Sequence, residues 1–231
     1  MVLANSDEAV RASAAGDYAA AVEQANAAIA GGDLRGYEIL AGLYVAGQGV
    51  EQDTQKGLQL LEEGAKKGSP GAAVKLGKLL RALERGGGPG EGRTFDLWRH
   101  AAEQGYGPAQ YLVAKEYELL YVATTRPEHR NAALSWYRKA VSAADPAQEE
   151  EISVTGNQMF CDIAYRIESS LESPPDAFGW YERCAYVGCA AGMERLAQAY
   201  ANGELGRPAD LPSADSWLER SQNARPEACL N

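Results

Sequence analysis

Residues 40–53 read LAGLYVAGQGVEQD, and the order of side chains at the start of this stretch recurs along the chain. An apolar residue is followed at once by a small one, and an aromatic or bulky apolar residue comes three positions after the small one. The copies start at Leu40, Leu76, Val113, Ile163 and Leu196. Successive starts are 36, 37, 50 and 33 residues apart. Self-similarity at such a spacing indicates a stack of repeated structural units.

A second pattern follows each copy of the first. It is a pair of bulky residues, with small residues three or four positions later: Leu60-Leu61, Leu97-Trp98, Trp136-Tyr137, Trp180-Tyr181 and Trp217-Leu218. Because three and four are helical offsets, the bulky and small side chains share one helix face. Each unit is therefore predicted to be an antiparallel pair, with helix A carrying the first pattern and helix B the second. The tryptophans of the second pattern are expected in the core.

One helix pair cannot bury its own apolar face, so neighbouring pairs must stack. The sequence predicts an all-α, right-handed α-solenoid whose concave face is lined by A helices. Glycine and proline clusters fall between the predicted helices, and Asp53 is expected to cap the first helix B. We expect a capping helix pair over residues 1–33, an array of about five repeats over residues 34–222, and a polar tail over residues 223–231.

Composition excludes several function classes. The 231-residue chain has a net charge of −10, which phosphates would repel, so nucleic acid is not an expected partner. No apolar run approaches the roughly 18 residues that a membrane span needs. The glycine-rich stretch 86–92 lacks the Lys-Ser/Thr of a phosphate-binding loop. His100 and His129 have no evident ligand set or nucleophile around them, so no metal, cofactor or catalytic site is expected.

The four cysteines lie in the last third of the chain and form no CxxC pair. Their even number favours two disulfides, and hence an oxidising compartment; four buried thiols are the alternative. The favoured pairing joins Cys161 to Cys184 and Cys189 to Cys229, and the alternative joins Cys184 to Cys189. No signal peptide is present, although Val2-Leu3-Ala4 would suit the end of a cleavage site.

The residues of both patterns resemble the Sel1-like repeat family, a longer-period relative of tetratricopeptide repeats. Residues 40–53 are similar to its signature LG-x-x-Y-x-x-G-x-GV-x-x-D, and residues 98–105, WRHAAEQG, are similar to its W-Y-x-K-A-A-E-Q-G ending. The resemblance covers residues 34–222. It departs from the family in the fourth unit, which lacks the GxG turn, and in the long linker 145–156.

This resemblance implies a non-catalytic protein-binding role. Bacterial members are often periplasmic, and some resemble immunity proteins that neutralise type VI secretion effectors, including phospholipases. The specific expectation is a periplasmic immunity or inhibitor protein that binds a secreted effector enzyme; a cytoplasmic location is the alternative. An assembly scaffold for an envelope or secretion complex is the second expectation, and a cell-wall-active hydrolase is a remote third.

The family also implies where a partner would bind. In related repeats, ligand contacts come from helix A, two residues before the first residue of the pattern and two and five or six after it. A solvated helix face is the alternative interpretation. These offsets select Glu38, Gly42, Val74, Lys78, Arg81, Tyr111, Lys115, Glu118, Tyr165, Glu168, Glu194, Gln198 and Asn202.

Overall fold

A computed structural model describes residues 6–83, 90, 92–142, 164–169, 174–186 and 188–224. The chain divides into two compact units, Met1–Leu119 and Leu120–Asn231, which we treat separately. Within the described ranges, every regular element is a helix. The expected all-α fold is therefore confirmed.

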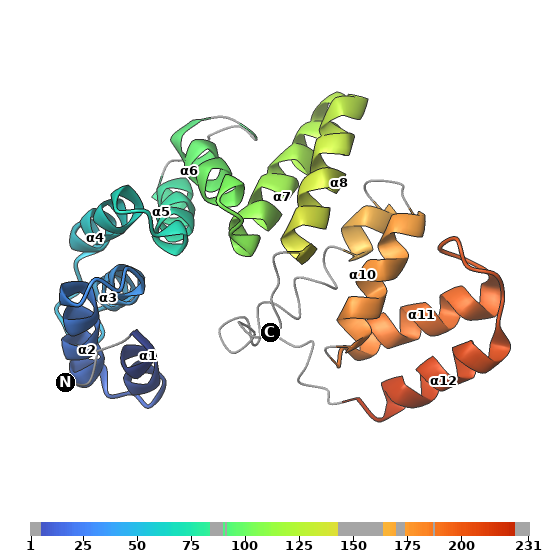
Figure 1. Cartoon of the computed structure of the whole chain (residues 1–231), viewed down its shortest axis with the longest axis horizontal. Coiled ribbons are helices and arrows are strands. Elements are labelled where there is room, and N and C mark those ends of the chain that lie inside the picture. Colours follow the sequence, from blue (N-terminus) through green and yellow to red (C-terminus); the bar gives the residue numbers. More distant parts are fainter. Residues whose placement is uncertain are drawn as a thin grey trace. The chain divides into compact units, whose positions relative to one another are not determined.

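The first unit is built from consecutive short helices, each lying beside the one before it (Figure 1). They are α1 (Ser6–Ala14), α2 (Tyr18–Ala30), α3 (Arg35–Ala46), α4 (Thr54–Lys66), α5 (Pro70–Leu83), α6 (Gly92–Glu103) and α7 (Gly107–Thr124), whose last residues belong to the second unit. Helix α3 also contacts α1 and α5. Alternate helices therefore share a layer, and α3, α5 and α7 are the A helices of the first three repeats.

The second unit continues the same alternation. Its helices are α8 (Pro127–Ser142), α10 (Pro174–Tyr186), α11 (Ala190–Asn202) and α12 (Leu211–Gln222), and residues 164–169 are also helical. Helix α11 packs against both α10 and α12 (Figure 1). The predicted order of A and B helices is thus found in both units. The finer division into a capping pair, an array and a tail stays a prediction.

Local chemistry fixes several helix ends where the sequence predicts them. The Asp53 carboxylate accepts a hydrogen bond from the Lys56 backbone N–H at 2.9 Å, so Asp53 caps α4 as expected. Asp17 and Asp210 cap α2 and α12 in the same way. Gly47 ends α3 with φ of 68°, a left-handed conformation that glycine adopts without a steric penalty.

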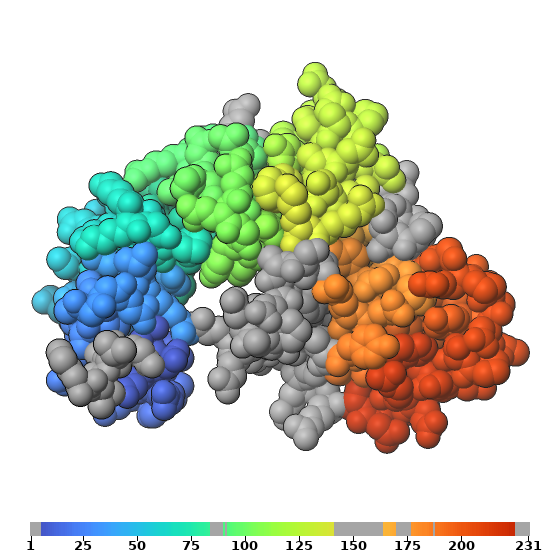
Figure 2. All heavy atoms as spheres, in the orientation of Figure 1, coloured from blue at the N-terminus to red at the C-terminus, as the bar shows by residue number. Residues whose placement is uncertain are grey.

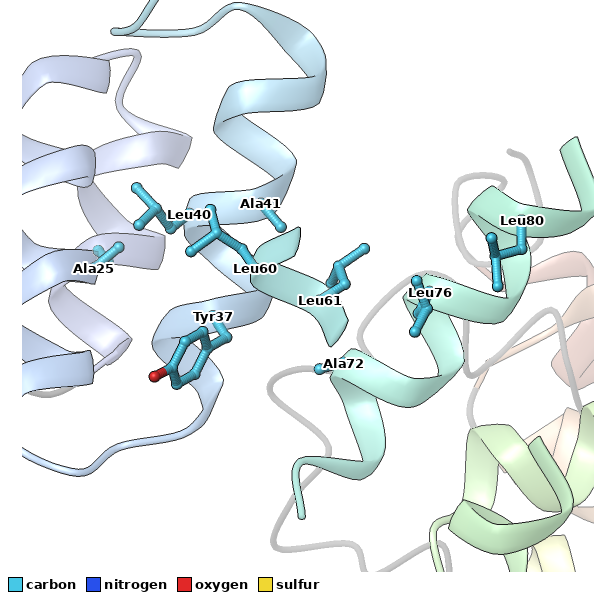
Figure 3. Packing of buried hydrophobic residues seen from close by; sticks show 10 residues of the cluster. Ala25, Tyr37, Leu40, Ala41, Leu60, Leu61, Ala72, Leu76 and Leu80 are labelled. Atoms are coloured by element: carbon cyan, nitrogen blue, oxygen red, sulfur yellow. The ribbon is translucent and has the colours of Figure 1, made fainter. Parts of the chain in front are cut away.

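The two sequence patterns meet in the core of the first unit. In Figure 3, Leu60 of α4 lies toward Leu40 of α3, and Leu61 lies toward Leu76 of α5. These residues belong to one buried cluster of apolar side chains. Side chains fill the spaces between neighbouring ribbons of this unit, as the space-filling view shows (Figure 2). The bulky pair of a helix B therefore joins its own helix A to the next one.

The predicted burial of the tryptophans is only half correct. Trp98 and Trp180 are buried, with 2% and 4% of their surface exposed, but Trp136 and Trp217 are half-buried. The ammonium group of Lys139 lies 3.9 Å from the Trp136 ring centroid, and the guanidinium of Arg220 lies 4.2 Å from that of Trp217. These two indoles are covered in part by long cationic side chains on their own helices rather than by the core.

Candidate protein-binding site

The helix A positions selected by the family resemblance differ in how far their side chains are exposed. We call the position two residues after the first residue of each pattern the +2 position. It is exposed in Gly42, Lys78, Tyr165 and Gln198, and half-buried in Lys115. Among the described residues, this offset is thus exposed on four of the five A helices and half-buried on α7.

The +5 position behaves in the opposite way and corrects part of the prediction. Arg81 is half-buried and paired with Glu116, Glu118 is buried with 3% of its surface exposed, and Glu168 is half-buried and paired with Arg195. The reason is helical geometry, because +5 lies four residues after the small residue that packs against helix B. Ala114, for example, is fully buried and shares a face with Glu118. The spacing to the small residue was the sequence signal that could have identified these positions as internal.

Arg81 is a structural residue in this fold. Its guanidinium donates to both carboxylate oxygens of Glu116, the second bond being 3.0 Å long, and this ion pair joins α5 to α7. Glu116 is 2% exposed and also accepts the Gly90 N–H at 2.9 Å. The carboxylate raises the pKa of Arg81. The guanidinium also lies 4.6 Å from the ring centroid of Trp98, so side chains of α5, α6 and α7 meet here.

Glu168 has an equivalent role in the second unit. Its carboxylate accepts the Tyr181 hydroxyl at 2.7 Å and the Nε–H of Arg195 at 3.1 Å. Arg195 in turn donates to Glu204 at 2.8 Å. Burial alone would raise the pKa of Glu168, but hydrogen bonds from Arg195 and Tyr181 outweigh it and lower the pKa. Glu168 therefore joins the segment 164–169 to α10 and α11.

The residues two positions before the pattern differ in their burial. Val74 is buried with 4% of its surface exposed, because its segment of α5 packs against Trp98, whose indole N–H donates to the Val74 carbonyl at 3.2 Å. The Glu38 side chain is only 14% exposed and accepts the Ser69 hydroxyl at 2.9 Å, which ties α3 to the start of α5. Tyr111 is half-buried and Glu194 is exposed. Val74 is therefore wrong as a surface residue, and Glu38 serves mainly as an internal contact.

A cationic surface remains on the A helices of the first unit after these corrections. It contains Lys78 and Lys115 from the prediction, and Lys75, which the sequence reasoning missed. We call these three residues the lysine face. Burial, followed by the charges of Lys75 and Lys115, lowers the pKa of Lys78. Lys78 is therefore within electrostatic range of both Lys75 and Lys115. Lys75 is one residue beyond the −2 offset, and its spacing of three from Lys78 could have placed it on this face.

One tyrosine and one carboxylate border the lysine face, and a second tyrosine, Tyr106, is close to the same carboxylate. The Lys115 ammonium lies 5.5 Å from the Tyr111 ring centroid, and the Lys75 ammonium lies 3.6 Å from Glu38 Oε2. Burial, with a smaller contribution from the Glu38 charge, raises the pKa of Tyr106 to about 12. Tyr111 thus makes a cation–π contact with Lys115, and tyrosine is a residue type enriched at protein interfaces.

The predicted surface in the second unit is less strongly charged. Tyr165 is 64% exposed, and Glu194, Gln198 and Asn202 are exposed. The Asn202 side-chain amide donates to Glu204 at 3.1 Å. These side chains offer an aromatic ring and several polar groups for contact with a partner.

Two of the predicted disulfide residues are described. Cys184 and Cys189 are both fully buried and both disulfide-bonded, so the alternative of free thiols is wrong for them. Cys161 and Cys229 lie outside the described residues, and the pairing stays a prediction. The Cys184 sulfur packs against Gly192, where a Cβ would overlap it. The cysteines therefore belong to the packing between α10 and α11.

The described part of the chain contains no cluster of three or more histidine, cysteine or acidic side chains that could hold a metal ion. His100 contacts Gln104 just beyond the end of its helix, and His129 contacts the Thr124 hydroxyl at 2.8 Å. Among the described helices, none combines the length and apolarity required to cross a membrane.

Comparisons with solved structures identify the fold. No protein-family model and no curated protein sequence matches the chain. A Sel1 repeat protein from Oxalobacter formigenes matches with a TM-score of 0.61 and 21% identity, over 95% of this chain and 82% of that protein. The immunity protein Pa5087 from Pseudomonas aeruginosa matches with a TM-score of 0.56 and 18% identity, over 94% of this chain and 81% of its own.

A third structure is that of c5321, a protective antigen with an SLR fold from uropathogenic Escherichia coli. It matches with a TM-score of 0.61 and 24% identity over 88% of this chain, which spans 41% of the antigen's length. At these identities the likeness concerns architecture. Sequential antiparallel helix pairs, the two interlocking patterns and these matches agree, and the chain has the all-α fold of Sel1-repeat proteins.

Proposed function

We propose that this chain is a non-catalytic binding protein whose A helices contact a protein partner. The observation that carries the proposal is the exposure of the +2 position, held by Lys78 in the first unit and by Tyr165 and Gln198 in the second. Exposed side chains at one offset of successive A helices offer contact points from consecutive repeats, which is how repeat proteins bind extended surfaces. Tyrosine is also among the residues that commonly dominate binding energy.

We further propose that the partner is a secreted effector enzyme, such as a phospholipase, and that this chain is its periplasmic immunity or inhibitor protein. The likeness of fold to the immunity protein Pa5087 over 94% of this chain supports this assignment. The disulfide-bonded state of Cys184 and Cys189 is consistent with an oxidising compartment. The type VI secretion system is the implied route of delivery for such an effector.

The test is an inhibition assay with the effector enzyme encoded beside this chain. We expect effector activity to fall to background once this protein is present in molar excess, because the partner's active site would be occluded. We expect co-expression to rescue cells from effector toxicity. Full effector activity in the presence of excess folded protein would overturn the immunity assignment.

The binding surface is tested in the same assay with charge reversals. Lys78→Glu changes a +2 residue on α5, which is a helix A. Lys66→Glu changes an exposed lysine on α4, which is a helix B of the same compact unit, Met1–Leu119. We expect Lys78→Glu to weaken inhibition and Lys66→Glu to leave it unchanged. An assembly scaffold would give a different pattern, with several bound proteins and no loss of enzyme activity.

A further inference from the structure

We propose that the lysine face of the first unit, Lys75, Lys78 and Lys115, receives an acidic segment of the partner protein. This inference rests on the proposed function, since it names the chemistry of the partner at the same surface. It also changes the residues involved, because Lys75 replaces Arg81 as the third cation of the surface.

Three lysines lie on two consecutive A helices. Lys75 and Lys78 are exposed and three residues apart on α5, and Lys115 lies on α7, the next helix A. The Arg81–Glu116 ion pair joins α5 to α7, so the three ammonium groups place like charges on adjoining helices. Burial, and then the charges of Lys75 and Lys115, lowers the pKa of Lys78. The whole chain has a net charge of −10, so three converging cations are a local reversal of its charge. An acidic ligand would relieve this repulsion.

Two carboxylates near these lysines already have partners within the fold. Glu38 is shared between the Ser69 hydroxyl and Lys75, whose ammonium is 3.6 Å away. The buried Glu116 is held by Arg81 and the Gly90 N–H. Glu38 therefore balances part of the charge of Lys75, whereas the carboxylate of Glu116 is taken up by Arg81.

An aromatic ring lies beside the cations. Tyr111 is half-buried with the Lys115 ammonium 5.5 Å from its ring centroid. Contacts between α3 and α5, and the Arg81–Glu116 ion pair between α5 and α7, fix the helices that carry these side chains. A partner would therefore meet positioned cations and a partly fixed aromatic ring, so little order would be lost on binding.

The size and setting of the cluster decide between classes of acidic partner. Three lysines in a chain of strongly negative net charge suit a short run of Asp and Glu residues. A nucleic acid or an anionic membrane would extend beyond the lysine face and meet the negative charge of the rest of the chain. We therefore assign the lysine face to an acidic protein segment.

The decisive experiment compares two triple charge reversals of the full chain. The test variant is Lys75→Glu, Lys78→Glu and Lys115→Glu on the A helices. The matched control is Lys56→Glu, Lys66→Glu and Arg99→Glu, which reverses three exposed cations on the B helices of the same unit. Both variants make the same change in net charge, so a difference between them reports position rather than total charge. Circular dichroism checks that both are folded.

Two readouts keep this inference separate from the proposed function. In the effector inhibition assay, we expect the test variant to be at least about tenfold weaker than wild type and the control to be unchanged. Inhibition by wild type and test variant alike would overturn the acidic-segment inference while leaving the proposed function intact. Failure of wild type to inhibit at all would count against the proposed function, and the second readout would then decide the inference.

The second readout uses a fluorescein-labelled hexaglutamate peptide at low salt. We expect wild type and the control variant to bind it, and the test variant to bind at least about tenfold more weakly. Absence of peptide binding by wild type, or equal binding by all three proteins, would overturn the inference. Tighter lysine-dependent binding to a DNA duplex or to phosphatidylglycerol vesicles would also overturn it, in favour of a different class of partner.

Discussion

A glycine-to-alanine substitution is expected to have opposite effects at two positions of the A helices. Gly42 and Gly77 both lie inside helices, in α3 and α5. A Cβ added at Gly42 would meet no heavy atom within 4 Å. A Cβ added at Gly77 would lie 2.9 Å from both Cδ1 and Cε2 of Trp98, and closer still to its Nε1. Substitution of Gly42 therefore tests helix propensity alone, whereas substitution of Gly77 tests helix propensity together with packing against Trp98.

The magnitudes follow from these surroundings. Alanine stabilises a helix interior by about 1 kcal/mol relative to glycine, so we expect Gly42→Ala to stabilise the protein by about that amount. Gly77→Ala has the same propensity gain. It also overpacks against a fixed, buried indole at a cost of about 1–3 kcal/mol, and it displaces the Trp98 hydrogen bond to Val74, which contributes about 1 kcal/mol. The expected net result is a loss of about 1–3 kcal/mol.

The assay is urea unfolding followed by circular dichroism, with the thermal midpoint as a second measure. For a chain of this size, each kcal/mol corresponds to roughly 2–4 °C in the midpoint. Replacing Trp98 with Leu should make Gly77→Ala tolerable, because the corresponding positions of the preceding repeat hold Leu61 and Ala41, which are both buried. A double-mutant cycle should therefore show coupling of about 1 kcal/mol or more. If Gly77→Ala stabilises the protein as much as Gly42→Ala, the close approach of helices α5 and α6 is wrong.

Three further predictions concern the internal contacts. Glu116→Ala should cost about 2–4 kcal/mol, because it removes a buried partner of Arg81 and Gly90, whereas Asp96→Ala, at an exposed ion pair, should stay within about 0.5 kcal/mol in the same urea titration. The lowered pKa of Glu168 means that its stabilisation is present above the ordinary value of 4.5 and is lost as the pH falls through the lowered value. The difference in unfolding free energy between wild type and Glu168→Gln should therefore shrink on acidification, and a pH-independent difference would refute this. Reduction of the disulfides that hold Cys184 and Cys189 should lower stability by about 2–5 kcal/mol. Thiol labelling of either cysteine in the native, unreduced protein would contradict the disulfide-bonded state on which this prediction depends.

The alternation of A and B helices could be predicted from the sequence because it depends on periodicity. Apolar, small and aromatic residues at helical offsets fix which face of each helix is buried, whatever its neighbours are. Leu40, Leu60 and Leu76 were expected to meet in a core, and they do. Asp53 could be predicted as a cap because capping depends on a side chain and an N–H only three residues away.

The residues of the candidate site could be predicted only in part. An offset rule selects one stripe of a helix, but one residue of error turns a side chain by about 100° (3.6 residues per turn). The offset rule selected Val74 and Glu118, which are buried, and missed the exposed Lys75 by one position. Trp136 and Trp217 carry the same pattern as buried tryptophans, yet their burial depends on what packs over helix B.

Taken by itself, the sequence determined that this protein is a stack of antiparallel helix pairs, because helical periodicity and capping act over a few residues. Only the tertiary structure decided which charged residues of the A helices are internal. Arg81 and Glu116 are 35 residues apart, and Glu168 and Arg195 are 27 apart, so no local pattern indicates that they form ion pairs. Their pairing requires consecutive A helices to lie side by side. That same packing leaves Lys75, Lys78 and Lys115 as the cations of the candidate site.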